Sequence, residues 1–192
     1  MNYRKGIKIS LVGTACTGKT TLLNALASIY PEFKIQNESV RYIKKKYGID
    51  FKSGDTGLQM AVLELQTRFS SNEQDYLLDR GPVDSYSYTK YYRNLGNSDM
   101  PASVYQFLCD ESKRNAIENI DLFIFLRPGE FPVVEDGTRI TDPQYLLDVD
   151  KLMEETIHEW GIEDKVIQPH GTILERVEFC KPYIDKLIEE RK

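Results

Sequence analysis

Residues 13–20 are the part of this chain whose residue types and spacing most directly predict chemistry. They read Gly-Thr-Ala-Cys-Thr-Gly-Lys-Thr and fit G-x-x-x-x-G-K-[ST], the pattern of a loop that surrounds phosphate oxygens with backbone N–H groups. Glycine lets the backbone approach a phosphate without a Cβ in the way, and the helix that follows adds its positive N-terminal end. Lys19 is expected to reach the β- and γ-phosphates, and the Thr20 hydroxyl to hold Mg²⁺. The loop therefore predicts the binding of a nucleoside triphosphate.

The segments that flank this loop have the pattern that such a site requires. Apolar residues alternate over residues 7–11 and predict a buried strand before the loop. After the loop, apolar residues recur at helical spacing over residues 22–29 and stop before Pro31. The alternative, a turn rich in glycine and threonine that binds nothing, does not explain why strand, loop and helix agree. The candidate nucleotide-binding residues are Gly13, Thr14, Ala15, Cys16, Thr17, Gly18, Lys19, Thr20 and Thr21, together with His170, whose loop could flank adenine.

An acid and a base end another predicted strand. Asp79 and Arg80 follow the apolar residues of a strand over residues 75–79. Ligands of open α/β sheets lie beyond the carboxyl ends of the strands, so Asp79 is expected to hold Mg²⁺ through water opposite Thr20. Arg80 is expected to neutralise charge on the transferred phosphoryl group or to grip a substrate. The alternative is an aspartate that caps the next turn beside a solvated arginine.

Glu38 is the first candidate for a general base. It follows a weaker predicted strand over residues 33–37. A carboxylate beside the γ-phosphate can accept the proton of an attacking hydroxyl group, and Asp79 is the second candidate for this role. Glu38 could instead be an acid that simply suits the dipole of a helix over residues 38–47.

The segment over residues 128–142 is too long and irregular for an ordinary connection, and it is rich in proline, glycine and acidic residues. Loops of this length are often active-site lids. A lid would exclude water and bring Arg127 or Arg139 to the phosphates. The alternative is a plain surface loop.

Other residues have both a functional and a structural interpretation. The tyrosines between residues 86 and 92 could stack on a base or a sugar, but their helical spacing favours core packing for most of them. The basic run over residues 41–47 could bind an acceptor that carries phosphate, or it could be a solvated helix face. Cys16 could have thiol chemistry at a helix N-terminus, although its role as a small loop residue is the favoured interpretation. His158 lies in a predicted helix and is expected to be inert.

Short apolar runs alternate with helical segments along the chain, which is typical of an α/β fold with a parallel sheet and helices on both faces. The strands are predicted over residues 7–12, 33–37, 75–79, 121–127 and 166–168. The helices are predicted over residues 22–29, 38–47, 56–71, 84–95, 101–119, 143–160 and 172–190, with the last kinked or interrupted by Pro182.

Length and composition limit the classes of function. The chain has 192 residues without repeats or linkers, which predicts a single domain over residues 1–192 with its lid. A formal net charge of −5 argues against tight, sequence-independent binding to long nucleic acids, although DNA stays open as an acceptor. No apolar run is long enough to span a membrane. The cysteines form no C-x-x-C pair and the N-terminus has no signal-peptide pattern, which predicts a cytoplasmic protein without a zinc site.

The spread of these motifs resembles the P-loop small-molecule kinases over nearly the whole chain. The matching segments are residues 13–20, the E-x-x-R of residues 38–43, residues 78–80, and the acid-rich D-G-x-R of residues 135–139. The resemblance is closest to the branch that includes the nicotinamide riboside kinase domain of bifunctional NAD-salvage proteins and many phage-encoded kinases. It implies a P-loop NTPase fold with a five-stranded parallel sheet, ATP with Mg²⁺ as phosphoryl donor, a nucleoside-like hydroxyl acceptor and an arginine-bearing lid.

The resemblance does not identify the acceptor. Deoxynucleoside kinases carry Glu-Arg-Ser where this chain has Asp79-Arg80-Gly81, and nicotinamide riboside kinases carry further acids there. The favoured function is therefore an ATP-dependent kinase that acts on a hydroxyl of a nucleoside, a nucleotide or a modified base. Nicotinamide riboside and a hydroxymethylated pyrimidine in DNA are alternative acceptors, and a nucleotide-hydrolysing switch or a nucleotide-binding scaffold is the alternative outside kinases. The catalytic candidates are Lys19, Glu38, Asp79, Arg80, Arg127 and Arg139, and the metal candidates are Thr20 and Asp79.

Overall fold

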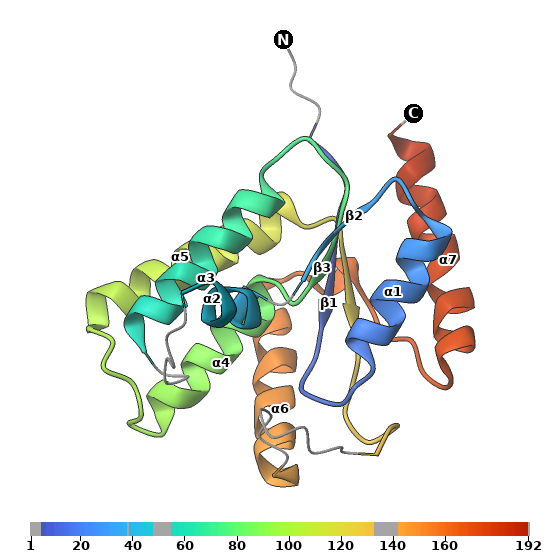
Figure 1. Ribbon diagram of the computed structural model, residues 1–192. Coiled ribbons are helices and arrows are strands. Elements are labelled where there is room, and N and C mark those ends of the chain that lie inside the picture. The colour runs from blue at the N-terminus through green and yellow to red at the C-terminus, as the bar shows by residue number, and fades with distance from the viewer. Residues whose placement is uncertain (1–4, 38, 48–54, 133–141, 192) are drawn as a thin grey trace.

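The protein folds around one sheet of five parallel strands. The computed structural model describes residues 5–37, 39–47, 55–132 and 142–191. The strand order is β2-β3-β1-β4-β5, and every neighbouring pair is parallel (Figure 1). The strands are β1 (Lys8–Val12), β2 (Lys34–Gln36), β3 (Tyr76–Asp79), β4 (Leu122–Phe125) and β5 (Val166–Ile167). The five-stranded parallel sheet that the sequence implies is thus confirmed.

Helices cover both faces of the sheet, as Figure 1 shows. One face is covered by α1 (Lys19–Ile29) and α7 (Ile173–Glu190), whose apolar residues pack in one core cluster with those of β1 and β4. The other face carries α3 (Thr56–Ser70), α4 (Pro82–Asn94), α5 (Ala102–Asn119) and α6 (Pro143–Trp160) in a second core cluster. The smaller helix α2 (Ser39–Tyr47) packs against α3, and a short 3₁₀ helix, η1 (Glu163–Lys165), precedes β5.

Burial on both faces explains why the strands could be recognised as apolar runs. In β1, Ile9 and Leu11 belong to the cluster under α1 and α7, and Val12 belongs to the cluster under the other helices. A parallel sheet that is covered on both sides favours apolar residues at successive positions, as in β4, although β1 also buries Lys8 and Ser10 beside its apolar residues.

The helix ends differ from the sequence predictions in small but explicable ways. Helix α4 begins at Pro82 rather than at residue 84, because proline is well suited to the first helical position. Helix α7 continues through Pro182, so the interruption that was one of the two predicted effects of this proline does not occur. Pro182 lies on the exposed face of α7, where water can satisfy the carbonyl that loses its helical partner.

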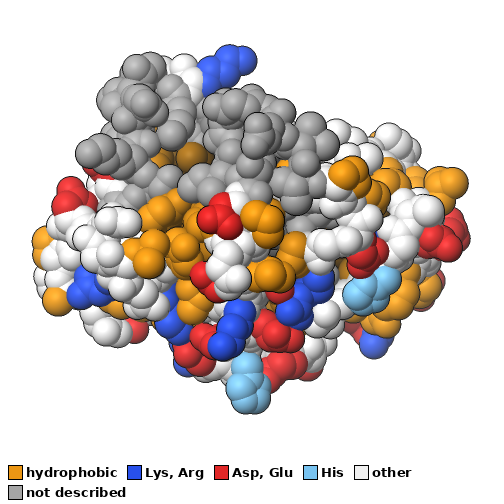
Figure 2. Space-filling model, turned by 90° about the horizontal axis from the view of Figure 1, so that it is seen from below, with side chains coloured by type: hydrophobic (Ala, Val, Ile, Leu, Met, Phe, Trp, Pro, Cys, Tyr) orange, Lys and Arg blue, Asp and Glu red, His pale blue; other side chains and the backbone are white. Residues whose placement is uncertain are grey.

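The carboxyl ends of the strands all meet at one edge of the sheet, at the bottom of Figure 1. The loop after β1, the turn after β3, the segment after β4 and the loop after β5 lie there together. Figure 2 looks onto this edge and shows charged side chains of both signs gathered beside hydrophobic ones among the described residues. None of the helices in the described part of the chain is long and apolar enough to cross a membrane.

Candidate active site

The phosphate-binding loop has the backbone shape that its glycines predict. Gly13 has a φ of +145°, and a Cβ there would lie 2.3 Å from the carbonyl oxygen of Leu126. Gly18 has a φ of +83° and is the N-cap of α1. A Cβ at Gly18 would lie 3.1 Å from the ring of Phe131. Glycine is therefore required at both ends of the loop, by conformation and by the neighbours that pack against it.

The N-terminus of helix α1 has no acidic or capping side chain of its own that would compete with a bound phosphate. The first turn contains no acidic residue, and no side chain caps it. The backbone N–H groups of this turn lack helical partners and carry the positive end of the helix dipole. Lys19 adds a nearly buried ammonium group, whose Nζ donates to the carbonyl of Thr14 and, at 3.1 Å, to the hydroxyl of Thr17. The loop thus concentrates positive charge and hydrogen-bond donors around one small volume.

Thr20 and Asp79 meet as the sequence predicts. The Thr20 hydroxyl donates to Oδ2 of Asp79 at 2.9 Å, and Asp79 is buried at the end of β3. β1 and β3 bring the two together, because Leu11 pairs with Asp79 in the parallel register. A hydroxyl and a carboxylate are hard oxygen ligands of the kind that Mg²⁺ prefers, and Mg²⁺ in such sites also uses phosphate oxygens and water. The donor set at this position therefore fits Mg²⁺.

Arg80 and Asp84 hold the first residue of the loop from both sides. Nη1 of Arg80 donates to the Gly13 carbonyl at 3.1 Å, and Oδ1 of Asp84 accepts from the Gly13 N–H at 3.2 Å. The two side chains also form an ion pair of 3.2 Å, and the guanidinium lies 5.0 Å from the ring centre of Tyr88. The Arg80 backbone is left-handed, with a φ of +74°, which costs on the order of 1 kcal/mol for a residue with a side chain. In this structure Arg80 therefore grips the loop itself.

The buried carboxyl group of Asp84 has a raised pKa. Complete burial raises the pKa of Asp84 from 3.8 to about 6, although Arg80, Lys19 and the N–H groups of Gly13 and Gly81 act in the opposite direction. The pKa is higher in the folded protein than in the unfolded chain, so the contribution of Asp84 to stability grows as the pH falls from about 6 toward 4. In the same pH range the carboxylate takes up a proton, which weakens its ion pair with Arg80 and its hydrogen bond from the Gly13 N–H.

Acid is therefore expected to lower donor affinity before it lowers stability. Below pH 6, kcat/KM for the donor should fall with a limiting slope of about tenfold per pH unit. An Asp84→Asn protein should have a lower kcat/KM for the donor at neutral pH. Its kcat/KM should not show the additional decrease below pH 6. Parallel pH profiles of both proteins check this, because titration of the nucleotide itself is common to the two. The same decrease in kcat/KM below pH 6 in the Asp84→Asn protein would contradict the role given to Asp84.

Arg127 lies against helix α6. Its Nε donates to Oδ2 of Asp150 at 2.9 Å, and its Nη1 donates to Oε1 of Glu154 at 2.8 Å. Its guanidinium also lies 4.9 Å from the ring centre of Phe125. These bonds occupy the guanidinium nitrogens that would have to reach the phosphates. Among the contacts of the described residues, none joins Arg127 to the loop of residues 13–20.

A second set of contacts holds the far end of the loop. Arg176 of α7 is fully buried, and its Nη1 donates to the Thr17 carbonyl at 2.7 Å. Its Nε donates to the Gly171 carbonyl at 3.0 Å, and its Nη2 donates to Oε2 of Glu130 at 3.0 Å. The ring of Phe131 lies 4.6 Å from the guanidinium carbon. One side chain thus joins the loop after β1 to the segments after β4 and β5.

Glu130 completes this set and accounts for the position of His170. Its Oε1 lies 2.7 Å from Nδ1 of His170, and its Oε2 accepts from the Gly171 N–H at 2.7 Å. Partial burial raises the pKa of Glu130, but the bonds from His170, Gly171 and Arg176 outweigh it and hold the pKa at about 2. His170 is thus beside the far end of the loop, although its ring is bonded to a carboxylate.

The other candidates from the sequence lie in the core, on the surface or outside the described residues. Tyr86 is buried, with its ring centre 5.1 Å from that of Trp160, as the core-packing interpretation predicts. His158 is exposed on α6 and bonded to Glu163. Glu38, Arg139, and residues 133–141 of the expected lid lie outside the described residues.

Comparison with known proteins identifies the family. A family model described as an AAA domain matches residues 8–176. The chain belongs to this AAA-domain family. Comparison of the AAA-domain chain with curated proteins found no match.

Solved structures show that this AAA-domain chain has the fold of the P-loop small-molecule kinases, which confirms the resemblance of the sequence. A NadR protein in complex with NR matches 86% of the chain and 46% of its own, with 20% identity and a TM-score of 0.68. The chain thus spans about half the length of the NadR chains that it matches. Deoxyadenosine kinase from M. mycoides matches 94% of the chain and 100% of its own, with 18% identity and a TM-score of 0.64. Thymidylate kinase from Candida albicans matches 98% and 94%, with 15% identity and a TM-score of 0.66.

Proposed function

We propose that this protein is an ATP-dependent kinase that transfers the γ-phosphoryl group to a hydroxyl group of a nucleoside, a nucleotide or a modified base. The observation that carries the proposal is the pairing of Thr20 with Asp79 at 2.9 Å, directly beside the N-terminus of α1 and Lys19. That arrangement combines an anion site with a site for a hard cation. Transfer of a phosphoryl group needs both, since its catalysis is mainly positioning and stabilisation of charge.

The chemistry assigns a role to each candidate. The acceptor oxygen attacks the γ-phosphorus, the bond from that phosphorus to the bridging oxygen breaks, and ADP leaves. Glu38, or in its place Asp79, takes the proton of the acceptor hydroxyl. Lys19 and the loop N–H groups stabilise the charge that develops on the phosphoryl oxygens. Thr20 and Asp79 would hold Mg²⁺, which would neutralise part of the phosphate charge.

The arginine candidates have different starting positions. Arg80 already touches the loop through the Gly13 carbonyl, so a rotation of its side chain could present it to a bound phosphate. Arg127 would first have to exchange its bonds to α6 for bonds to phosphate. Arg139 belongs to the segment proposed as a lid. We assign the stabilisation of the transferred phosphoryl group to one or more of these residues.

A small nucleoside-like acceptor is favoured over a nucleic-acid polymer. The net charge of −5 opposes tight binding to a polyanion. The structural neighbours include a NadR protein in complex with NR and a deoxyadenosine kinase, which favours nicotinamide riboside or a nucleoside as the first acceptors to test.

A mass-spectrometric screen tests the proposed function. The protein is incubated with ATP and Mg²⁺ and a panel of nucleosides, nucleotides, nicotinamide riboside and hydroxymethylated DNA. We expect one class of acceptor to gain the mass of one phosphoryl group as ADP accumulates. Release of inorganic phosphate at a rate that no acceptor increases would indicate a hydrolysing switch instead. Tight nucleotide binding with neither product would indicate a binding scaffold.

A further inference from the structure

We propose that Arg176 and Glu130 are positioning residues that set donor affinity, because they lock the exit of the phosphate-binding loop to the segments after β4 and β5. The inference rests on the proposed function, since it concerns the donor nucleotide of that reaction. Neither residue is part of the motif that identifies the loop, and Arg176 is 159 residues away from Thr17 along the chain. Arg176 is fully buried, so it acts through the residues that it holds rather than on the nucleotide directly.

The bonding of Arg176 ties three segments to one charge. Its guanidinium donates to Thr17 in the loop after β1, to Gly171 in the loop after β5, and to Glu130 in the segment after β4. A buried positive charge is stable only while its acceptors stay in place. Movement of any one of the three segments therefore costs the bonds of Arg176. The three segments behave as one unit for this reason.

The bond to Thr17 bears directly on phosphate binding. Thr17 and Gly18 share a peptide bond, and in a trans peptide the C=O and the next N–H point in opposite directions. Arg176 holds the Thr17 carbonyl at 2.7 Å, so the Gly18 N–H is turned to the side away from Arg176. Gly18 is the N-cap of α1, where the donors of the anion site begin. Arg176 thus fixes the direction of a donor that it does not touch.

Glu130 and Phe131 support this arrangement from the segment after β4. Glu130 accepts from the Gly171 N–H, bonds His170, and pairs with the guanidinium at 3.0 Å. The Phe131 ring lies over the guanidinium and also against Gly18, where a Cβ would be only 3.1 Å from it. The residues that begin the segment proposed as a lid are therefore already joined to the phosphate-binding loop.

The position of these residues in the fold predicts an effect on the donor alone. The strand order places β4 and β5 on one side of β1, and β3 and β2 on the other. Asp79, the second candidate for the base that takes the acceptor proton, is the last residue of β3. Arg176 and Glu130 lie on the side of β4 and β5. Loss of their bonds should therefore weaken donor binding and leave the KM of the acceptor unchanged.

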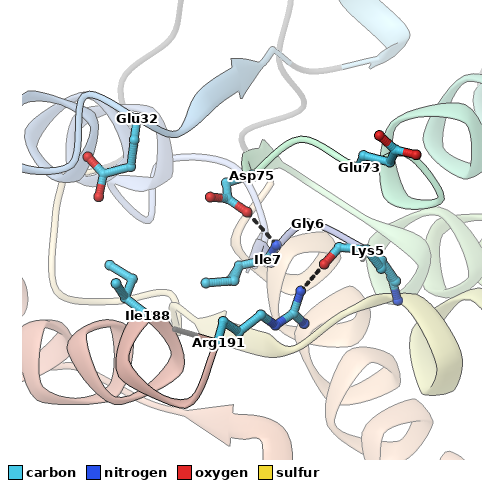
Figure 3. A pocket seen from close by; sticks show the side chains of 8 residues that line it. All are labelled: Lys5, Gly6, Ile7, Glu32, Glu73, Asp75, Ile188 and Arg191. Atoms are coloured by element: carbon cyan, nitrogen blue, oxygen red, sulfur yellow. Dashed lines mark hydrogen bonds between the residues drawn. The ribbon is translucent and has the colours of Figure 1, made fainter. Parts of the chain in front are cut away.

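Two conservative variants test the proposal, and a third is their control. Arg176→Lys keeps the charge but cannot reach all three acceptors, and Glu130→Gln keeps the shape but removes the negative charge. Arg191→Lys is the matched control. Arg191 is the C-cap residue at the end of α7. Its guanidinium also donates to a backbone carbonyl, that of Lys5, and pairs with a carboxylate, that of Asp121 at 2.6 Å. It lies at the opposite edge of the sheet, in the wall of a pocket of about 340 Å³ (Figure 3).

Calorimetry with Mg·ADP and with Mg·tripolyphosphate gives the decisive readouts. Arg176→Lys should weaken both by about tenfold or more, because the loop itself is affected. Glu130→Gln should weaken Mg·ADP by about fivefold to tenfold and Mg·tripolyphosphate less, because Glu130 bonds His170 and Gly171 of the loop that is expected to flank adenine. Arg191→Lys should bind both probes as the parent protein does.

The outcomes separate this inference from the proposed function. Parental affinity for both probes in folded Arg176→Lys and Glu130→Gln proteins would overturn the inference while leaving kinase activity intact. A rise in the KM of the acceptor as large as the loss in donor affinity would also overturn the inference, because it would indicate that the whole site is disturbed. If Arg176→Lys does not fold, the Glu130→Gln result alone decides. A parent protein that binds neither probe would refute the proposed function first.

Discussion

A Lys19→Ala protein is expected to fold normally and to transfer phosphoryl groups about 10²- to 10³-fold more slowly than its parent. Lys19 supplies the one lysine ammonium of the loop, and it is nearly buried beside the carbonyl of Thr14 and the hydroxyl of Thr17. Charge that develops on the transferred group is stabilised most by donors that are already in place and shielded from water. Turnover is measured by mass spectrometry of the phosphorylated acceptor, and folding by thermal unfolding.

A second lysine separates loss of catalysis from loss of a bond between a lysine and a backbone carbonyl. Lys165 also donates to backbone carbonyls, those of Ile117 and Ile120, but it lies just before β5 at the other edge of the sheet. Lys165→Ala should keep the parental rate. Equal rates for Lys19→Ala and its parent would refute the role of the loop in transfer.

An Asp79→Asn protein is expected to lose about 10²-fold or more in turnover and to need a higher Mg²⁺ concentration for half-maximal rate. The amide can still accept the hydrogen bond that Thr20 donates at 2.9 Å, so local structure should change little. The neutral amide cannot supply the negative charge that attracts Mg²⁺. Rates measured over a Mg²⁺ titration check this prediction.

Two substitutions at Thr20 test the other half of the site. Thr20→Ser keeps the hydroxyl and should stay close to the parent, whereas Thr20→Val keeps the shape, loses the oxygen and should resemble Asp79→Asn. If Asp79→Asn responds to Mg²⁺ as the parent does, Asp79 does not hold the metal.

The sequence was most informative where function depends on residues that are close along the chain. The glycines, Lys19 and Thr20 form one continuous loop, and their spacing alone predicts an anion site. Asp79 could be added because the ends of parallel strands converge at one edge, and the structure indeed brings it to Thr20. The strand β4 was recognisable for a related reason, since burial on both faces favours an unbroken apolar run.

The residues that hold the loop in shape could not be identified in the same way. Asp84 bonds Gly13 across 71 residues of sequence, and Arg176 bonds Thr17 across 159. No local periodicity reports such a contact. The weak signals were an acid four residues after Arg80, which suits an i,i+4 pair, and an arginine at an otherwise core-facing position of α7. Arg127 shows the converse, because its position after β4 suggested phosphate while its nearest carboxylates belong to α6.

A crystal structure with Mg²⁺ and a non-hydrolysable ATP analogue tests the proposed site most directly. We expect the β-phosphate to accept hydrogen bonds from the backbone of residues 13–20 and from Lys19, and the metal to lie between Thr20 and Asp79. We also expect an open cleft on the side of β3 that admits an alcohol to the γ-phosphate. A nucleotide bound elsewhere, or a γ-phosphate that no acceptor could approach, would contradict the proposed kinase.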